Sequence, residues 1–189
     1  MRGEILLVRH GRSALAWPTN AITAKEFREW IATYDRTGIS GDSAPSTELV
    51  AATRETGVVV CSNLARSIES AARLLPGHSP CVSALYREAG RPLNGNWPIR
   101  LPLDVWDHIS RSLWQMNWIS SDEPFHVAQT RAQDATRELV RLADEFGRVL
   151  CVGHGTLNSF LARELCGLGW QGPRRILDDY WGATVFQMP

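Results

Sequence analysis

Three segments of the sequence carry histidine or arginine directly after, or close behind, an apolar run typical of a buried strand. They are Arg9-His10-Gly11 after residues 5–8, Arg66 after residues 58–61, and Gly153-His154-Gly155 after residues 149–152. In open α/β sheets, ligands bind where the carboxyl ends of the strands meet. We therefore expect these side chains to converge on one anion-binding site, although a single histidine at a strand end is more often a packed structural residue.

The residue types in these segments suit the transfer of a phosphoryl group. A neutral imidazole is a nucleophile at physiological pH and can carry a phosphoryl group covalently. Arginines and a second imidazole can bind the equatorial phosphoryl oxygens. Glu88 follows a weaker apolar run at residues 81–85 and can protonate the leaving oxygen, then activate water. This chemistry requires no metal, and the sequence has no obvious carboxylate cluster to hold one.

The predicted strands alternate with predicted helices. Thr23 and Glu26 form a capping-box pattern that predicts a short helix with Phe27 and Tyr34 on one face. Further helices are predicted over residues 46–54, 68–75, 127–146 and 157–166, and a closing strand over residues 183–186. This order predicts an α/β fold, a three-layer α/β/α sandwich around a mostly parallel sheet. We expect residues 1–189 to form a single domain.

Residues 89–124 have the weakest periodicity and contain four tryptophans, Trp97, Trp106, Trp114 and Trp118. We expect a small irregular cap over the active edge of the sheet, with one short helix near residues 103–117. Packing within the cap is the favoured role for the tryptophans, and an aromatic shelf for the substrate is the alternative. Arg87, Arg91 and Arg100 are expected on a solvated loop face, although they could extend the anion site.

The composition limits the classes of partner. Lys+Arg and Asp+Glu number 20 each, so the formal net charge is zero and no basic tract points to nucleic acid. The four cysteines form no Cys-x-x-Cys pair, and we expect neither disulfides nor zinc, in a reducing, cytoplasmic compartment. No apolar run is long enough for a membrane span, and the N-terminus does not resemble a signal peptide. The oligomeric state is left open.

In combination and order, these motifs resemble those of the histidine phosphatase superfamily, the phosphoglycerate mutase-like family. Arg9-His10-Gly11 matches its N-terminal motif, residues 62–67 resemble its Ser-Asp-Leu-x-Arg-Ala/Thr segment, and Gly153-His154-Gly155 matches its late Gly-His-Gly. Glu88 stands where the family carries its proton donor. Asp122-Glu123-Pro124, followed by Arg131, resembles a Gly-Glu-Ser segment. Each motif is weak alone, and their ordered combination over the whole chain is specific.

The resemblance implies a role for each matching residue. His10 would be the nucleophile that forms a phosphohistidine, and Glu88 the general acid and base. Arg9, Arg66 and His154 would form the phosphate pocket, and Ser13 and Gly155 would contribute to substrate binding. The resemblance implies a small phosphorylated substrate and neither metal nor cofactor.

The sequence also departs from the family pattern. Arg12, Ser13 and Ala16 replace the Glu, Thr and Asn that often follow the first motif, and the longer insertions of the mutases are absent. Mutase activity is therefore disfavoured, and hydrolysis of a phosphomonoester is the leading hypothesis. The alternatives are a phosphohistidine-protein phosphatase, which needs an open pocket, and a non-catalytic phospho-ligand binding module, which has no need of Glu88.

Overall fold

A five-stranded sheet is the centre of the computed structural model, which describes residues 3–95, 97–119, 121–176 and 179–188. The strands are β1 (Glu4–Arg9), β2 (Val58–Ser62), β3 (Cys81–Ser83), β4 (Arg148–Gly153) and β5 (Ala183–Gln187), in the order β3-β2-β4-β1-β5. Neighbouring strands are parallel except for the edge strand β5, which is antiparallel to β1. The prediction of a mostly parallel sheet is confirmed.

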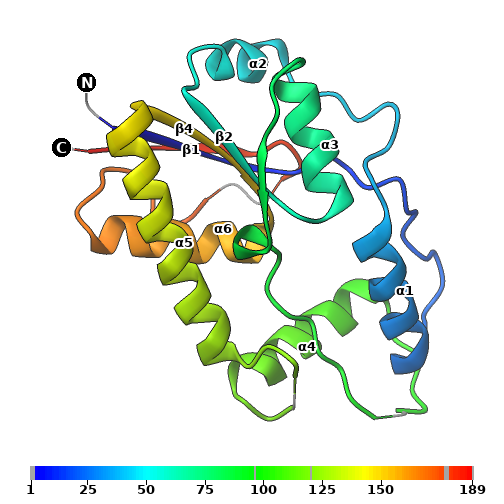
Figure 1. The fold of residues 1–189 in the computed structure, drawn as a ribbon. Helices are drawn as coiled ribbons and strands as arrows, with labels where there is room; N and C mark the ends of the chain where they lie inside the picture. The colour runs from blue at the N-terminus through cyan, green and yellow to red at the C-terminus, as the bar shows by residue number, and fades with distance from the viewer. Residues whose placement is uncertain (1–2, 96, 120, 177–178, 189) are drawn as a thin grey trace.

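Helices cover both faces of this sheet. The alternation of β1 sends Leu6 and Val8 to one face, where they pack in a core that also holds residues of α2 (Thr47–Thr53) and α3 (Ala65–Leu74). Ile5 and Leu7 point to the other face, into a core with α5 (Phe125–Phe146) and α6 (Gly155–Gly167). Figure 1 shows these two helix pairs flanking the strands, which gives the predicted three-layer sandwich.

The cap is larger than the sequence predicted. Helix α1 (Ala24–Arg36) packs against α4 (Leu103–Gln115), and Phe27 and Trp106 share a separate apolar cluster there. The Trp106 indole N–H donates to the Ile22 carbonyl at 2.7 Å, and an antiparallel bridge joins Ile22 to Leu101. Figure 1 places α1 and α4 together, away from α2 and the upper strands. The cap predicted from residues 89–124 is therefore extended by α1.

Local signals in the sequence explain most element boundaries. Thr23 and Glu26 form the predicted capping box at the start of α1. The predicted strand at residues 81–85 is shorter, because Ser83 accepts a hydrogen bond from the Leu85 N–H at 3.1 Å and residues 84–86 turn into a 3₁₀ helix. The helices α3, α5 and α6 each begin two or three residues earlier than predicted.

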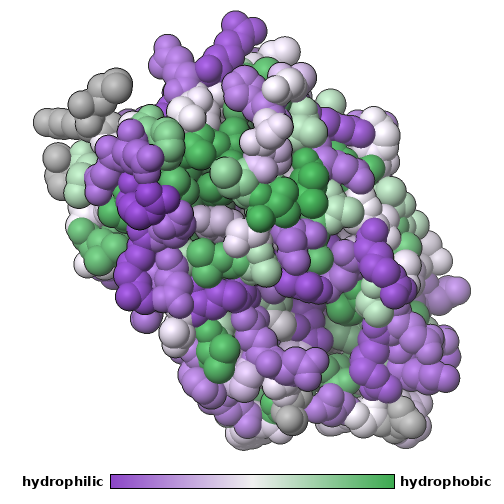
Figure 2. Space-filling model, in the orientation of Figure 1, coloured by the Kyte–Doolittle hydropathy of each residue, from purple (hydrophilic) through white to green (hydrophobic). Residues whose placement is uncertain are grey.

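The cap tryptophans divide into two groups. Trp106 and Trp114 are buried, so the packing role holds for them, whereas Trp97 and Trp118 are exposed by 44% and 74%. Trp114 reaches the core shared with α5 and thus ties the cap to the sandwich. Polar and apolar side chains are interspersed on the face in Figure 2, with hydrophilic groups gathered over α1 at the lower right.

The four cysteines are free thiols, and Cys61 and Cys151 are buried in the core as expected. Burial raises the pKa of the Cys61 thiol to about 11. Within the described ranges, no helix combines the length and apolar character needed to cross a membrane.

Candidate active site

The sheet register brings the two histidines together. Arg9 lies opposite Gly153 in the parallel ladder of β1 and β4, so the residues that follow, His10 and His154, leave neighbouring strands at the same edge. The His10 backbone N–H donates to the Gly153 carbonyl at 3.0 Å, and the two imidazole centroids are 5.0 Å apart. The convergence expected from the motif spacing is therefore present.

The hydrogen bonds of His10 fix its tautomer. Its Nδ1 lies 2.7 Å from the Gly11 carbonyl oxygen, which can only accept, so Nδ1 carries the proton. Its Nε2 accepts a hydrogen bond from the Arg66 Nε–H at 3.2 Å. Burial, together with the charge of Arg66, lowers the pKa of His10 to about 3. His10 is thus neutral at physiological pH, with the Nε2 lone pair directed at Arg66.

Arg66 is held on all sides in the second position of α3. Its side chain is fully buried, and its Nη1 donates to the Tyr34 carbonyl at 3.0 Å. The Asp35 carboxylate lies 3.4 Å from the same guanidinium, and the Tyr34 ring faces it at 4.2 Å. These contacts orient the guanidinium toward His10 and partly balance its charge.

At the same edge, the His154 ring has no hydrogen-bond partner among the described residues. It is fully buried, and neither ring nitrogen makes a hydrogen bond. Burial lowers the pKa of His154 well below its usual value, although the nearby Glu88 charge opposes this shift. A buried polar group without a partner is costly, so this imidazole is suited to hydrogen-bond an incoming ligand oxygen.

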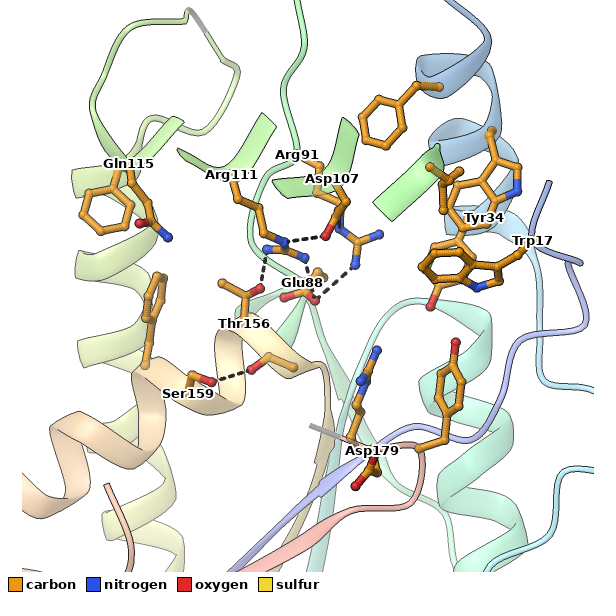
Figure 3. A pocket seen from close by; sticks show the side chains of 18 of the residues that line it. Trp17, Tyr34, Glu88, Arg91, Asp107, Arg111, Gln115, Thr156, Ser159 and Asp179 are labelled. Carbon is orange, nitrogen blue, oxygen red and sulfur yellow. Dashed lines mark hydrogen bonds and ion pairs between the residues drawn. The ribbon is translucent and has the colours of Figure 1, made fainter. Parts of the chain in front are cut away.

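Glu88 lies at the other side of His154 and is surrounded by donors. Its Oε1 accepts from the backbone N–H of Leu157, in the first turn of α6, at 3.2 Å, and its Oε2 lies 3.5 Å from Arg91 and 3.7 Å from Arg111. Figure 3 shows both arginines pointing at this carboxylate. Burial alone would raise the pKa of Glu88, but Arg111, His154 and Arg91 outweigh it and hold the pKa well below its usual value. The resting site therefore holds Glu88 ionised.

Asp107 and Thr156 complete this network. Asp107 lies 3.3 Å from Arg91 and 3.1 Å from Arg111, and Arg111 also donates to the Thr156 hydroxyl. Arg91, expected on a solvated loop, is instead largely buried, because these carboxylates neutralise it. In contrast, Arg87 and Arg100 are about half exposed, as expected.

A cavity of about 680 Å³ opens beside this network. Of the predicted site residues, Arg9, Glu88 and Gly155 line it, whereas His10, Arg66 and His154 are buried and are not part of its lining. Tyr34 and Tyr180 also line the cavity, with ring centroids 6.4 Å and 5.9 Å from the His10 ring. The Arg9 guanidinium lies 4.8 Å from the Tyr180 ring centroid.

Ser13 and Gly11 make local contacts beside the first motif. The Ser13 hydroxyl accepts a hydrogen bond from the Leu15 N–H at 3.2 Å, and Ser13 does not line the cavity. At Gly11, an added Cβ would lie 2.4 Å from the Trp181 ring, so packing against this tryptophan requires the glycine.

Sequence reasoning missed Tyr34 and Tyr180, which lie near His10, and Arg111, which lies beside Glu88. Tyr34 was placed on the apolar face of its helix and Arg111 inside the cap helix, without a role in the site. The Asp107–Arg111 spacing of four residues is a detectable helical pair, but it does not reveal that Glu88 is their shared neighbour. In the described part of the chain, no three histidine, cysteine, aspartate or glutamate side chains form a metal-binding group.

The neutral state of His10 predicts a dependence of stability on pH. The unfolded chain takes up this proton near the ordinary pKa of 6.5, whereas the folded protein takes it up only near 3, so the free energy of unfolding should fall as pH drops through this window. In His10→Asn, the free energy of unfolding should fall less steeply over this pH range, by up to about 1.4 kcal/mol per pH unit. Urea unfolding at several pH values, with His78→Asn as the surface control, measures it. Parallel curves for wild type and His10→Asn would contradict the assignment.

Comparison with known proteins places this geometry in a family. The model for the histidine phosphatase superfamily (branch 1) matches residues 46–188, and no curated protein matches the sequence. Among solved structures, the product of an open reading frame of Mycobacterium tuberculosis superposes with a TM-score of 0.58 at 18% identity, over 86% of this chain and 79% of that one.

Two named phosphatases are also similar in fold. A mycobacterial glucosyl-3-phosphoglycerate phosphatase matches with a TM-score of 0.52 at 22% identity, over 86% of this chain and 79% of its own. The phosphoserine phosphatase of Entamoeba histolytica matches with a TM-score of 0.52 at 12% identity, over 98% and 97%. At these identities the structures show a shared fold, and the family model covers most of the sequence. The chain therefore belongs to the histidine phosphatase superfamily.

Proposed function

We propose that this protein is a metal-independent phosphatase that hydrolyses a small phosphomonoester through a phosphohistidine on His10. The observation that carries the proposal is the neutral His10, whose Nε2 lone pair faces Arg66 at 3.2 Å and lies beside the unpartnered ring of His154. A nucleophile, a fixed cation and a free hydrogen-bonding group then meet at one point. These are the groups that a phosphoryl transfer needs.

In the first step, His10 Nε2 attacks phosphorus, the N–P bond forms and the P–O bond to the alcohol breaks. Arg66 exchanges its hydrogen bond to His10 for one to a phosphoryl oxygen, and Arg9 and His154 bind the other oxygens. In the second step, water attacks phosphorus, the N–P bond breaks and inorganic phosphate leaves with His10 neutral again. Neither step changes an oxidation state.

Glu88 is proposed to move the protons. Glu88 donates a proton to the departing alkoxide and receives a proton from the attacking water, so it is protonated again at the end of the cycle. The resting Glu88 is ionised, and a phosphoryl dianion nearby raises the pKa of this carboxyl, because like charges disfavour its ionised form. Substrate binding therefore favours the protonated form of Glu88 before the alcohol leaves.

The cavity favours a small substrate over a phosphohistidine on a protein surface. It lies between α1 and α4, whose residues wall it on two sides, whereas a protein substrate needs an open approach to His10. The complete set of polar groups, including Glu88, also argues against a module that only binds a phosphorylated ligand.

A direct test is phosphate release from a panel of sugar phosphates, nucleotides, phosphoglycerates and a phosphohistidine peptide. We expect turnover of at least one monoester, unchanged after exhaustive treatment with a chelator, because the proposed steps use only side chains of the chain itself. Activity lost on chelation and restored by magnesium or zinc would overturn the metal-independent mechanism. Release from the peptide alone would favour the protein-directed alternative.

A further inference from the structure

The cavity beside the catalytic residues is much larger than a phosphoryl group. Its volume of about 680 Å³ lies within the range of pockets that hold whole small molecules, roughly 300–1,000 Å³. It is continuous with the proposed reaction site, because Arg9 and Glu88 form part of its lining. The remaining space must therefore accommodate the alcohol part of the substrate.

Aromatic rings from the N-terminal part of the cap form one side of this space. The rings of Trp30 and Tyr34 stack with centroids 4.9 Å apart and planes inclined by 17°, and Trp17 meets Trp30 edge-on at 5.9 Å. The Trp30 indole N–H donates to the Ala16 carbonyl at 3.2 Å, which fixes the loop that carries Trp17. Trp17 is nevertheless 52% exposed while it lines the cavity.

Two phenylalanines also line the cavity. Phe125 and Phe160 pack edge-to-face with centroids 5.9 Å apart, and both line the cavity. In Figure 3, Trp17 and Tyr34 lie on one side of the view and Gln115 on the other, with the network around Glu88 between them. The cavity therefore presents aromatic surface beside a charged centre.

Two of the arginines that line the cavity, Arg91 and Arg111, are already paired. Arg91 and Arg111 share Glu88 and Asp107, two cations with two carboxylates. A second anionic group on the substrate would have to compete with these carboxylates. An uncharged group that contacts ring faces meets no such competition.

We propose that the substrate is a phosphomonoester whose alcohol part carries a planar ring, which packs against Trp17 and Trp30. This inference rests on the proposed phosphatase function and specifies its substrate class. Trp17 is then a specificity-determining residue, because the exposed part of its ring is covered only when the substrate is bound.

The test compares alkyl phosphates whose alcohols have similar basicity, so that leaving-group chemistry does not vary. We expect kcat/KM for 2-naphthylmethyl phosphate to exceed that for cyclohexylmethyl phosphate, propyl phosphate and phosphoserine. In Trp17→Ala, the ratio of kcat/KM for the naphthylmethyl and propyl esters should fall about tenfold, since stacking on an aromatic ring is worth roughly this factor or more. The matched control is Trp118→Ala, which removes a more exposed tryptophan outside the cavity.

Several outcomes overturn the inference while the phosphatase function stands. They are equal rates for the planar and saturated rings, a preference for phosphoserine, and an unchanged ratio in Trp17→Ala. A binding measurement keeps the inference testable if no ester is hydrolysed. Calorimetry with 2-naphthylmethanol, the product alcohol, should detect binding to the His10→Ala protein, weakened about tenfold when Trp17→Ala is added. No detectable binding of this alcohol would also overturn it.

Discussion

Replacing His10 with alanine is expected to abolish both turnover and the covalent phosphoenzyme. The loss in kcat should be at least ~10⁴-fold, because the variant lacks the atom that accepts the phosphoryl group and the two-step path no longer exists. His10 supplies the neutral Nε2 at this edge of the sheet, held by Gly11 at one nitrogen and Arg66 at the other. Rapid quenching in base, where phosphohistidine survives, followed by intact mass measurement detects the intermediate.

The control for this experiment is His78→Ala, an exposed histidine far from the site in sequence, which should keep the activity of the wild type. Circular dichroism checks that both variants fold. A phosphoenzyme that persists in His10→Ala would mean that the nucleophile lies elsewhere. His154 would then be the first residue to replace, because its ring is 5.0 Å from that of His10.

Replacing Glu88 with glutamine is expected to slow phosphorylation of His10 by roughly 10²–10⁴-fold for an alkyl phosphate. Glutamine keeps the shape of the side chain and has no carboxyl proton to give. A nitrophenyl phosphate should lose far less, because nitrophenolate departs without protonation. The quantity to measure is the rate loss for the alkyl phosphate divided by the rate loss for the nitrophenyl phosphate, both in single-turnover phosphorylation. A general disturbance of the site would slow both substrates equally and leave this ratio at one.

The network around Glu88 sharpens this comparison. Glutamine leaves Arg91 and Arg111 with Asp107 as their remaining acidic partner among the described residues, so a structural effect would slow both substrates alike. Equal losses would therefore show that Glu88 is not the acid. Glu123 would then be the next carboxylate to replace, although it forms a two-point ion pair with Arg131, at 2.5 Å and 2.8 Å.

Local sequence patterns predicted the sandwich and the meeting of His10 with His154. Short apolar runs and the polar residues that follow them define the strand ends, and parallel strands bring those ends to one edge. The Thr23–Glu26 capping box likewise acts within a few residues. Such features depend on residues that are close in the sequence, so a single sequence is enough to predict them.

The parts that were missed depend on contacts between distant segments. The cap includes α1 because Trp106 donates to Ile22 across 84 positions, a pairing that no local pattern indicates. The burial of Arg91 follows from the position of Asp107, one helix away. The charge state of Glu88 also escaped prediction, since burial and two arginines act in opposite directions and only their positions decide the result.

The neighbours of β1 in the sheet have a consequence for synthesis of the chain. Residues 4–9 pair with residues 148–153 and 183–187, both in the last quarter of the sequence. At 5–20 residues per second, the ribosome needs on the order of ten seconds to make the intervening segment. Through that interval the apolar strand that precedes the proposed nucleophile has neither partner, and it is exposed to association with other chains. The catalytic centre is therefore among the last parts of the molecule to assemble, and a nascent chain that stops before β4 has no active site.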